Sequence, residues 1–177
     1  DLGAAGFGMF QLFKDDYANK TLSGINSLAT KLMKMGMDTK DDPATQFVAL
    51  REARDLAITV GNADVALQSL NFMVRFFAMD AKENRLDILK GLGKTVKTPE
   101  QARIAAKFCE TYAEEAVIKN DYEGALQYLD YADKNLRIAK NPPLIVALQA
   151  KAKRVSEIKR EYSKVAKIEA KLTGGGD

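Results

Sequence analysis

The fold is decided by a segment that occurs twice, as AITVGNADVALQSLNF at residues 57–72 and as AVIKNDYEGALQYLDY at residues 116–131. In each copy a helical pattern stops at a Gly or Asn, a residue type that can end a helix in the left-handed conformation. The Asn or Asp that follows caps the next helix, and a shared alanine (Ala66, Ala125) lets two helix backbones approach closely. The repeat therefore predicts a helical hairpin that the chain uses twice.

The same helical spacing extends in both directions from this repeat. Apolar residues recur every three or four positions, and no stretch alternates with the period of two that a half-buried strand needs. All four prolines stand where a helix would begin, three of them directly after a capping residue at Asp42, Thr98 or Asn141. These signals predict an all-α fold of about eight antiparallel helices joined by short connections. The helices are expected over residues 9–18, 21–36, 43–60, 63–78, 81–96, 99–119, 122–140 and 142–172.

The two ends of the chain differ in composition from its centre. Six of the 12 glycines lie within the first eight and the last four residues. Glycine-rich ends of this kind are typical of flexible segments at the edges of a piece of a longer polypeptide. We therefore predict a flexible segment over residues 1–8, a single helical-repeat domain over 9–172, and a Gly-rich linker or tail over 173–177.

The composition excludes several classes of active site. The 177 residues include no histidine and one cysteine, Cys109, which excludes a His-based triad, a His-ligated metal, a multi-cysteine zinc site and an intrachain disulfide. The net charge of +3 is too small to indicate a specific nucleic-acid partner. No apolar run approaches the roughly 20 residues of a membrane-spanning helix. We expect a non-enzymatic protein without a cofactor, a metal, a specific nucleic-acid partner or a transmembrane segment.

The repeated hairpin resembles the tetratricopeptide repeat family. Its Gly-Asn or Asn-Asp turn, the Ala-Leu-Gln near the start of the second helix, and the small residues Ala57 and Ala116 match that pattern. Two features depart from this pattern. The copies are 59 residues apart rather than about 34. A helix-crossing position that is normally occupied by a small residue carries Arg54 in the first copy, although Ala113 in the second copy conforms. The resemblance implies an irregular, tetratricopeptide-like right-handed α-solenoid with a long C-terminal helix.

A second resemblance covers most of the chain, from residue 9 to about residue 165. It is carried by DDPATQFVALREARDLAITVGNADVALQSL at residues 41–70, TPEQAR at 98–103 and NDYEGALQYLDYADK at 120–134. These strings are similar to a helical segment, uncharacterised in function, of large multidomain bacterial envelope or secreted proteins. The resemblance implies no catalytic residue and a periplasmic or secreted location. A cytoplasmic location is the alternative, because a single cysteine fits either redox compartment.

In tetratricopeptide-like proteins the first helix of each hairpin lines a concave groove, which implies a set of charged partner-binding residues in this chain. The candidates are Arg51, Asp55, Lys107, Glu110 and Glu114. Tyr128 and Tyr131 are added because they lie off the main apolar stripe of their helix, and Tyr is an efficient contact residue. The alternative for all of them is an ordinary solvated or packed face.

The last predicted helix carries a narrow apolar seam made of Leu148, Val155, Ile158, Tyr162 and Val165. Such spacing is typical of a surface that pairs with a partner helix in a coiled coil. Residues 151–171 also hold eight Lys and Arg against three Glu. Three interpretations stay open. The helix caps the repeat domain, or it projects as a stalk that forms a homodimer or leads to a neighbouring domain, or it binds an acidic surface, nucleic acid or lipid headgroups.

The function that these patterns favour is a protein–protein interaction scaffold or spacer within a larger multidomain protein. It would hold a peptide, a partner protein or a neighbouring domain of the same polypeptide by shape and charge complementarity. One alternative is a module that binds a polyanion or a charged surface through the basic helix over 151–171. Another is an enzyme or small-molecule binder with a pocket between helices.

Overall fold

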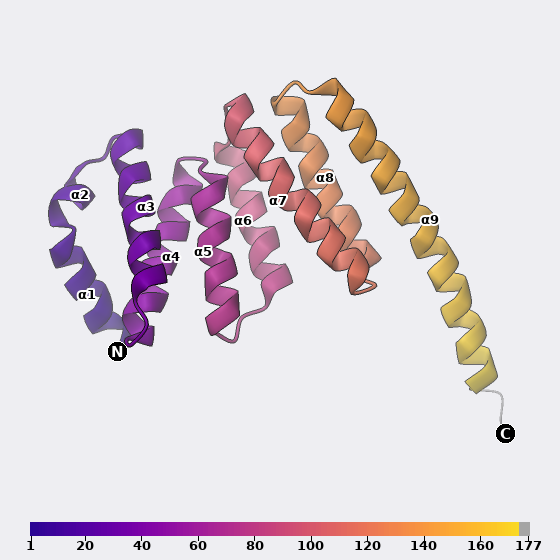
Figure 1. Ribbon diagram of the computed structural model, residues 1–177, viewed down its shortest axis with the longest axis horizontal. Helices are drawn as coiled ribbons and strands as arrows, with labels where there is room; N and C mark the ends of the chain where they lie inside the picture. The colour runs from indigo at the N-terminus through magenta and orange to yellow at the C-terminus, as the bar shows by residue number, and fades with distance from the viewer. Residues whose placement is uncertain (174–177) are drawn as a thin grey trace. The chain divides into compact units, whose positions relative to one another are not determined.

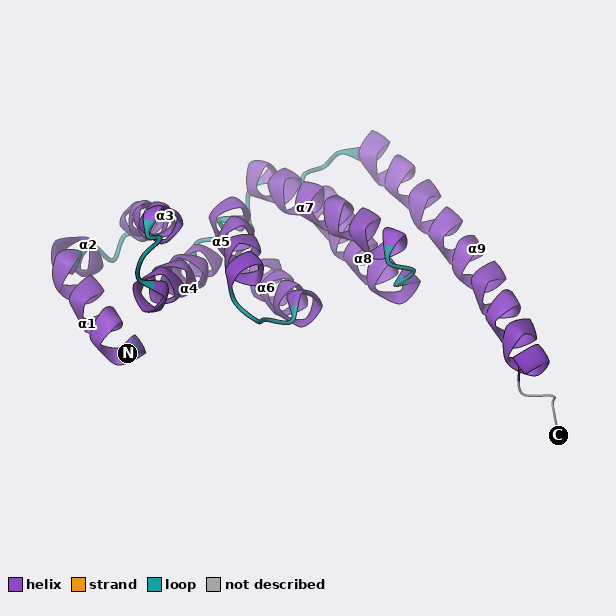
Figure 2. Cartoon of the chain, turned by 60° about the horizontal axis from the view of Figure 1, so that its bottom comes forward, coloured by secondary structure: helices purple, strands orange, loops and turns teal. Residues whose placement is uncertain are grey.

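A computed structural model describes residues 1–173 of the protein, and within this range every regular element is a helix (Figures 1 and 2). The all-α prediction is confirmed. The described residues form nine helices: α1 (Leu2–Leu12), α2 (Lys14–Ala18), α3 (Leu22–Asp38), α4 (Pro43–Thr59), α5 (Ala63–Phe76), α6 (Ala81–Thr95), α7 (Pro99–Ile118), α8 (Tyr122–Ile138) and α9 (Pro142–Thr173). No helix among them is both long enough and apolar enough to cross a membrane.

The N-terminal region differs from the prediction. The helix expected over 9–18 begins at Leu2 and is divided into α1 and α2, so the segment 1–8, expected to be flexible, is helical. The side chain of Asp1 caps α1 by accepting a backbone hydrogen bond at 2.9 Å. Packing explains the difference, because α1 lies against α4 and a Cβ at Gly6 would be 3.9 Å from Val48. Tertiary contact thus outweighs the low helix propensity of the glycines.

The Gly-rich tail predicted over 173–177 lies, apart from Thr173, outside the described residues. The remaining seven helices begin and end within a few residues of their expected positions. Their caps explain this agreement, since local signals set the ends of helices. At the start of α7, for example, the Gln101 N–H donates to Thr98 Oγ1 at 3.2 Å and Gln101 Oε1 accepts from the Thr98 N–H at 3.1 Å. This arrangement is a reciprocal capping box.

Three turns of the chain share one backbone conformation. Gly61, Asn120 and Lys140 have φ angles of 70°, 58° and 51°, so each occupies the left-handed region at the end of a helix. In each turn the next N–H donates to the carbonyl five residues back, at 2.9, 2.8 and 3.3 Å. Two of these turns connect α4 to α5 and α7 to α8, and the third connects α8 to α9. The predicted repeat of the helix-ending turn is therefore present, and it occurs a third time before α9.

The contacts between residues group the chain into two compact units. The sequence predicts a single helical-repeat domain over 9–172. The first unit comprises Asp1–Ile104 and the second begins at Ala105, so α7 starts in one unit and continues in the other. In the first unit the core lies between α3, α4 and α5, which pack against one another. Gly36 permits a close approach of α3 to α4, because a Cβ there would lie 2.6 Å from Leu50 Cγ.

The second unit contains most of α7 together with α8 and α9, and these helices run alternately in opposite directions (Figure 1). α8 packs along α9. The core includes Cys109, Tyr112, Tyr128, Leu129, Leu136, Leu148 and Val155. Near the start of α8, Lys159 pairs with Glu123 and the ring of Tyr162 lies against that of Tyr122. α9 then continues beyond the end of the α7–α8 hairpin (Figure 1).

Candidate functional site

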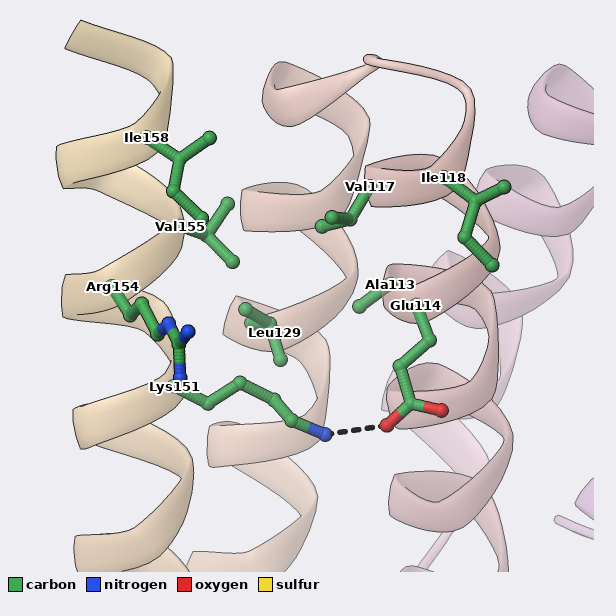
Figure 3. Close-up of a pocket in the computed structure, with 9 residues that line it drawn as sticks. All are labelled: Ala113, Glu114, Val117, Ile118, Leu129, Lys151, Arg154, Val155 and Ile158. Carbon is green, nitrogen blue, oxygen red and sulfur yellow. Dashed lines mark hydrogen bonds and ion pairs between the residues drawn. The ribbon is translucent and has the colours of Figure 1, made fainter. Parts of the chain in front are cut away.

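The second unit carries an apolar pocket of about 420 Å³ bounded by α7, α8 and α9 (Figure 3). Its lining consists of Ala113, Glu114, Val117, Ile118, Leu129, Lys151, Arg154, Val155 and Ile158. Leu129 comes from α8, which lies between the other two helices in this view (Figure 3). The pocket is thus a groove with α8 as its floor and with α7 and α9 as its walls, and we call it the α7–α9 groove.

Helical spacing brings the apolar side chains of each wall together. Ala113 and Val117 stand four residues apart on α7, and Val155 and Ile158 stand three residues apart on α9. Residues at these separations share one face of a helix. Each wall therefore presents an apolar strip to the groove, and charged side chains of the two walls lie at its edges.

Lys151 of α9 links the two walls through ion pairs with two glutamates of α7. Lys151 Nζ lies 2.7 Å from Glu114 Oε1 and 3.7 Å from Glu110 Oε2 (Figure 3). The hydrogen bond to Glu114 raises the pKa of Lys151, and partial burial acts in the opposite direction. The lysine stays charged at neutral pH, and it joins α9 to α7 at one end of the groove.

Exposed apolar side chains border the groove on both walls. Ile118 is 82% exposed and Ile158 is 37% exposed. Along α9 the apolar surface continues to Tyr162, whose ring lies 5.3 Å from that of Tyr122, and then to Val165, Ile168 and Leu172. Large side chains left in water in this way are typical of surfaces that another molecule covers.

The predicted seam of the last helix divides into two halves. Leu148 and Val155 are 4% and 6% exposed, whereas Ile158, Tyr162 and Val165 are 37%, 49% and 53% exposed. The first half packs within the second unit. The second half reaches the end of the hairpin and passes it, so a large part of its surface is open to solvent.

The charged candidates fall into two groups. Arg51 and Asp55 belong to α4 in the first unit, where each pairs with a neighbour in its own helix, Glu52 at 3.7 Å and Arg54 at 2.7 Å. Lys107, Glu110 and Glu114 belong to α7 in the second unit. These three recur at steps of three and four, so they share one face of α7. Glu114 lines the α7–α9 groove, Glu110 contacts Lys151, and Lys107 is exposed.

The two tyrosine candidates have different environments. Tyr128 is 2% exposed and its ring lies 5.6 Å from that of Tyr112, so the prediction that it is on a contact surface is wrong. The reason is that α8 contacts both α7 and α9, and a helix with two neighbours buries more than one stripe. Tyr131 is half-buried, with Lys134 Nζ 5.3 Å from the centre of its ring.

The apolar lining that α7 contributes is not among the residues predicted from the sequence. Val117 and Ile118 precede the turn at Asn120, and Ile118 stands off the buried stripe of its helix. Ile118 lies on the face of α7 that the periodicity assigns to solvent, and a large apolar residue on that face is the signal that could have identified this lining. Leu129 gave no such signal, because it belongs to a stripe that the pattern assigns to the core.

The thiol of Cys109 lies in the core of the second unit. Burial raises the pKa of the Cys109 thiol to about 12, and the nearby Glu110 carboxylate adds to this effect. The thiol is therefore protonated at neutral pH, and the side chain is fully buried. Within residues 1–173, no three Asp, Glu or Cys side chains converge closely enough to hold a metal ion.

Comparisons with protein-family models, with curated proteins and with solved structures found no significant match to this chain.

Proposed function

We propose that the protein is a non-enzymatic interaction scaffold whose α7–α9 groove binds a helical segment of a partner protein or of a neighbouring domain. The observation that carries this proposal is the apolar groove itself, bordered by the exposed Ile118 and Ile158 and by charged side chains of both walls. Grooves of this kind bind the apolar face of an amphipathic helix in many recognition modules.

The repeated turn supports a tetratricopeptide-like interpretation of the hairpins, in an irregular right-handed solenoid. Gly61 and Asn120 have matching φ angles at equivalent positions, and Asn62 and Asp121 cap the helices that follow. In such repeats the first helices of successive hairpins form the binding surface. α7 would be the first helix of the second hairpin, and α9 would hold the same position in a third.

A small-molecule site is less well supported by the lining. Pockets for small ligands combine an apolar wall with several polar groups that converge on the ligand. Here the polar lining residues are Glu114, Lys151 and Arg154, and the first two bind each other. An apolar helix face matches the groove better than a polar metabolite does.

The test is to titrate the full chain into a panel of labelled amphipathic helical peptides and to measure fluorescence anisotropy. Ile118→Glu places a charge at the groove, and Val146→Glu is the matched control, because Val146 is also exposed but does not line the groove. We expect at least one peptide to bind the wild type and the control equally and to bind Ile118→Glu about tenfold more weakly. Absence of binding throughout the panel, or equal binding to both variants, would overturn the proposal.

Binding of a polyanion through residues 151–171 is a weaker candidate. Four of the eight basic side chains, those of Lys151, Lys159, Arg160 and Lys164, are already paired with glutamates. Binding to phosphate groups would require several unpaired cations and would fall steeply with salt. A salt-insensitive interaction would exclude this candidate.

A further inference from the structure

The α7–α9 groove is closed at one end and open at the other. At the closed end Lys151 of α9 reaches across to Glu114 of α7, and the two side chains meet at 2.7 Å (Figure 3). At the open end the walls finish with Ile118 and Ile158, which are both exposed to solvent. α9 continues past this end as far as Thr173. A helix that lies on the groove floor can therefore leave by the open end, whereas the ion pair blocks it at the closed end.

Both walls of the groove run in the same direction. The lining passes from Ala113 to Ile118 along α7 and from Lys151 to Ile158 along α9, so both helices run from the closed end to the open end (Figure 3). α8, which forms the floor, runs the opposite way (Figure 1). A helix that runs from the open end to the closed end is antiparallel to both walls, and its macrodipole then opposes theirs. This direction places the C-terminus of the occupant at the ion pair.

The charged side chains that line the groove favour the same direction. Lys151 and Glu114 are paired with each other, and Glu110, which contacts Lys151 at 3.7 Å, does not line the groove. The third charged lining residue, Arg154, is exposed and forms no ion pair within residues 1–173. The last turn of a helix carries a partial negative charge and carbonyl oxygens without intrahelical partners. Arg154 can donate hydrogen bonds to these oxygens, whereas the N–H groups of a helix N-terminus offer it no acceptor.

We infer that the partner helix binds antiparallel to α7 and α9, with its C-terminal turn at Arg154 and at the Lys151–Glu114 pair. Its apolar face covers Leu129 on the floor of the groove, and its N-terminal part leaves by the open end. This inference rests on the proposed function and adds the direction of the helix and the terminus that the groove recognises. The partner is therefore a segment in which a helix ends, such as the last helix of a protein, rather than the middle of a long helix.

The charges beyond the open end do not select an acidic or a basic partner. Ile158, Val165 and Leu172 recur at intervals of seven residues and form an exposed apolar line on α9. Helical spacing places Glu161 and Glu169 on or beside this line. The feature of the partner that the groove recognises is therefore a helix terminus, and the net charge of the partner has no part in it.

The experiment uses the full chain and a helical peptide of about 15 residues, which has a leucine stripe and has alanine and glutamine at its other positions. The peptide carries a neutral fluorophore on its N-terminal amine, and it is made with either a free C-terminal carboxylate or a C-terminal amide. Affinities are measured by fluorescence anisotropy for the wild type, for Arg154→Gln and for Lys153→Gln. Lys153→Gln is the matched control, because Lys153 is an exposed neighbour that does not line the groove.

We expect the wild type to bind the free carboxylate about threefold to fivefold more tightly than the amide, because the carboxylate forms a charge-assisted hydrogen bond with Arg154. Arg154→Gln should remove this preference, and Lys153→Gln should keep it. Equal binding of the two forms by the wild type, or a preference that both variants keep or both lose, would overturn the inference while leaving the proposed function standing. If neither form of the peptide binds, both fail.

The direction of the bound helix is measured separately, with a nitroxide near one terminus of the peptide and with the full chain isotopically labelled. We expect the C-terminal nitroxide to broaden the amide signals around Glu114 and Lys151, and the N-terminal nitroxide to broaden those around Ile118 and Ile158. The opposite pattern, or the same pattern from both labels, would overturn the inference. Light scattering that shows a dimer of the free chain, dissociated by the peptide, would assign the groove to a second copy with the same consequence. We expect a monomer.

Discussion

Lys151 of α9 and Glu114 of α7 lie 37 residues apart in sequence, and their side chains meet at 2.7 Å. α8 separates them along the chain and forms the floor beneath them. The pair links the two walls of the α7–α9 groove and places a positive and a negative charge at its edge. Substitutions around this pair test the geometry of the groove.

Replacing Lys151 with Met removes the charge and keeps the apolar stem. Both partners are partly exposed, so we expect the free energy of unfolding to fall by less than about 1 kcal/mol. Glu114 raises the pKa of Lys151 above its unfolded value of 10.5, so this contribution is complete below that pH and is lost as the pH rises through the folded-state pKa. Urea unfolding of both proteins at neutral pH and at about pH 11 measures the difference, and a difference that grows at high pH would contradict the account.

The two halves of the apolar seam should respond differently when a charged residue is introduced. Val155 is 6% exposed and Val165 is 53% exposed, on the same helix. We expect Val155→Asp to destabilise the protein by about 3 kcal/mol or more, because an unpaired carboxylate enters the core. Val165→Asp should change stability by less than about 1 kcal/mol. Thermal unfolding followed by circular dichroism compares them, and equal losses would contradict the described packing of α9.

The helix-ending turns offer a matched pair of positions. Gly61 has a φ of 70°, and a Cβ there would lie 2.7 Å from the carbonyl oxygen of Thr95. We expect Gly61→Ala to cost about 1–3 kcal/mol, from backbone strain and from this clash. Asn120→Gly, at the equivalent position of the second hairpin, should cost less than about 1 kcal/mol, because glycine accepts the left-handed conformation freely. Chemical denaturation measures both, and tolerance of alanine at position 61 would contradict the turn.

The burial of Cys109 predicts a protected thiol. Its pKa is raised to about 12, so the folded state favours the neutral thiol. Stability from this group is complete below the unfolded pKa of 9.0 and declines as the pH rises above it, because the unfolded thiol ionises first. We expect a thiol reagent such as DTNB to label the native protein very slowly and the protein in denaturant rapidly. Rapid labelling of the native protein would show that the core of the second unit is open.

The helices of this chain were predictable because their signals are local. The capping box at Thr98 and the repeated turn at Asn120 each depend on residues within a few positions. The first part of α1, over residues 2–8, was missed because its glycines favour a flexible segment. This part of the helix packs against α4, where Gly6 lies near Val48, and no local pattern contains that contact. Long-range packing decided this element.

The candidate site was predictable only in part. Glu110 and Glu114 were found because the family resemblance pointed to the first helix of the hairpin. The groove itself requires α7 and α9 to pack on opposite sides of α8, and the sequence does not specify that arrangement. The same packing buries Tyr128, which periodicity alone had placed off the core stripe.

The most direct test of the account is to map where an amphipathic helical peptide binds the isotopically labelled full chain, by changes in backbone amide NMR shifts. The account predicts that the shifted amides cluster at the α7–α9 groove and along α9, around Val117, Leu129, Ile158 and Val165. Shifts confined to the first unit, or no shifts at a saturating peptide concentration, would contradict it.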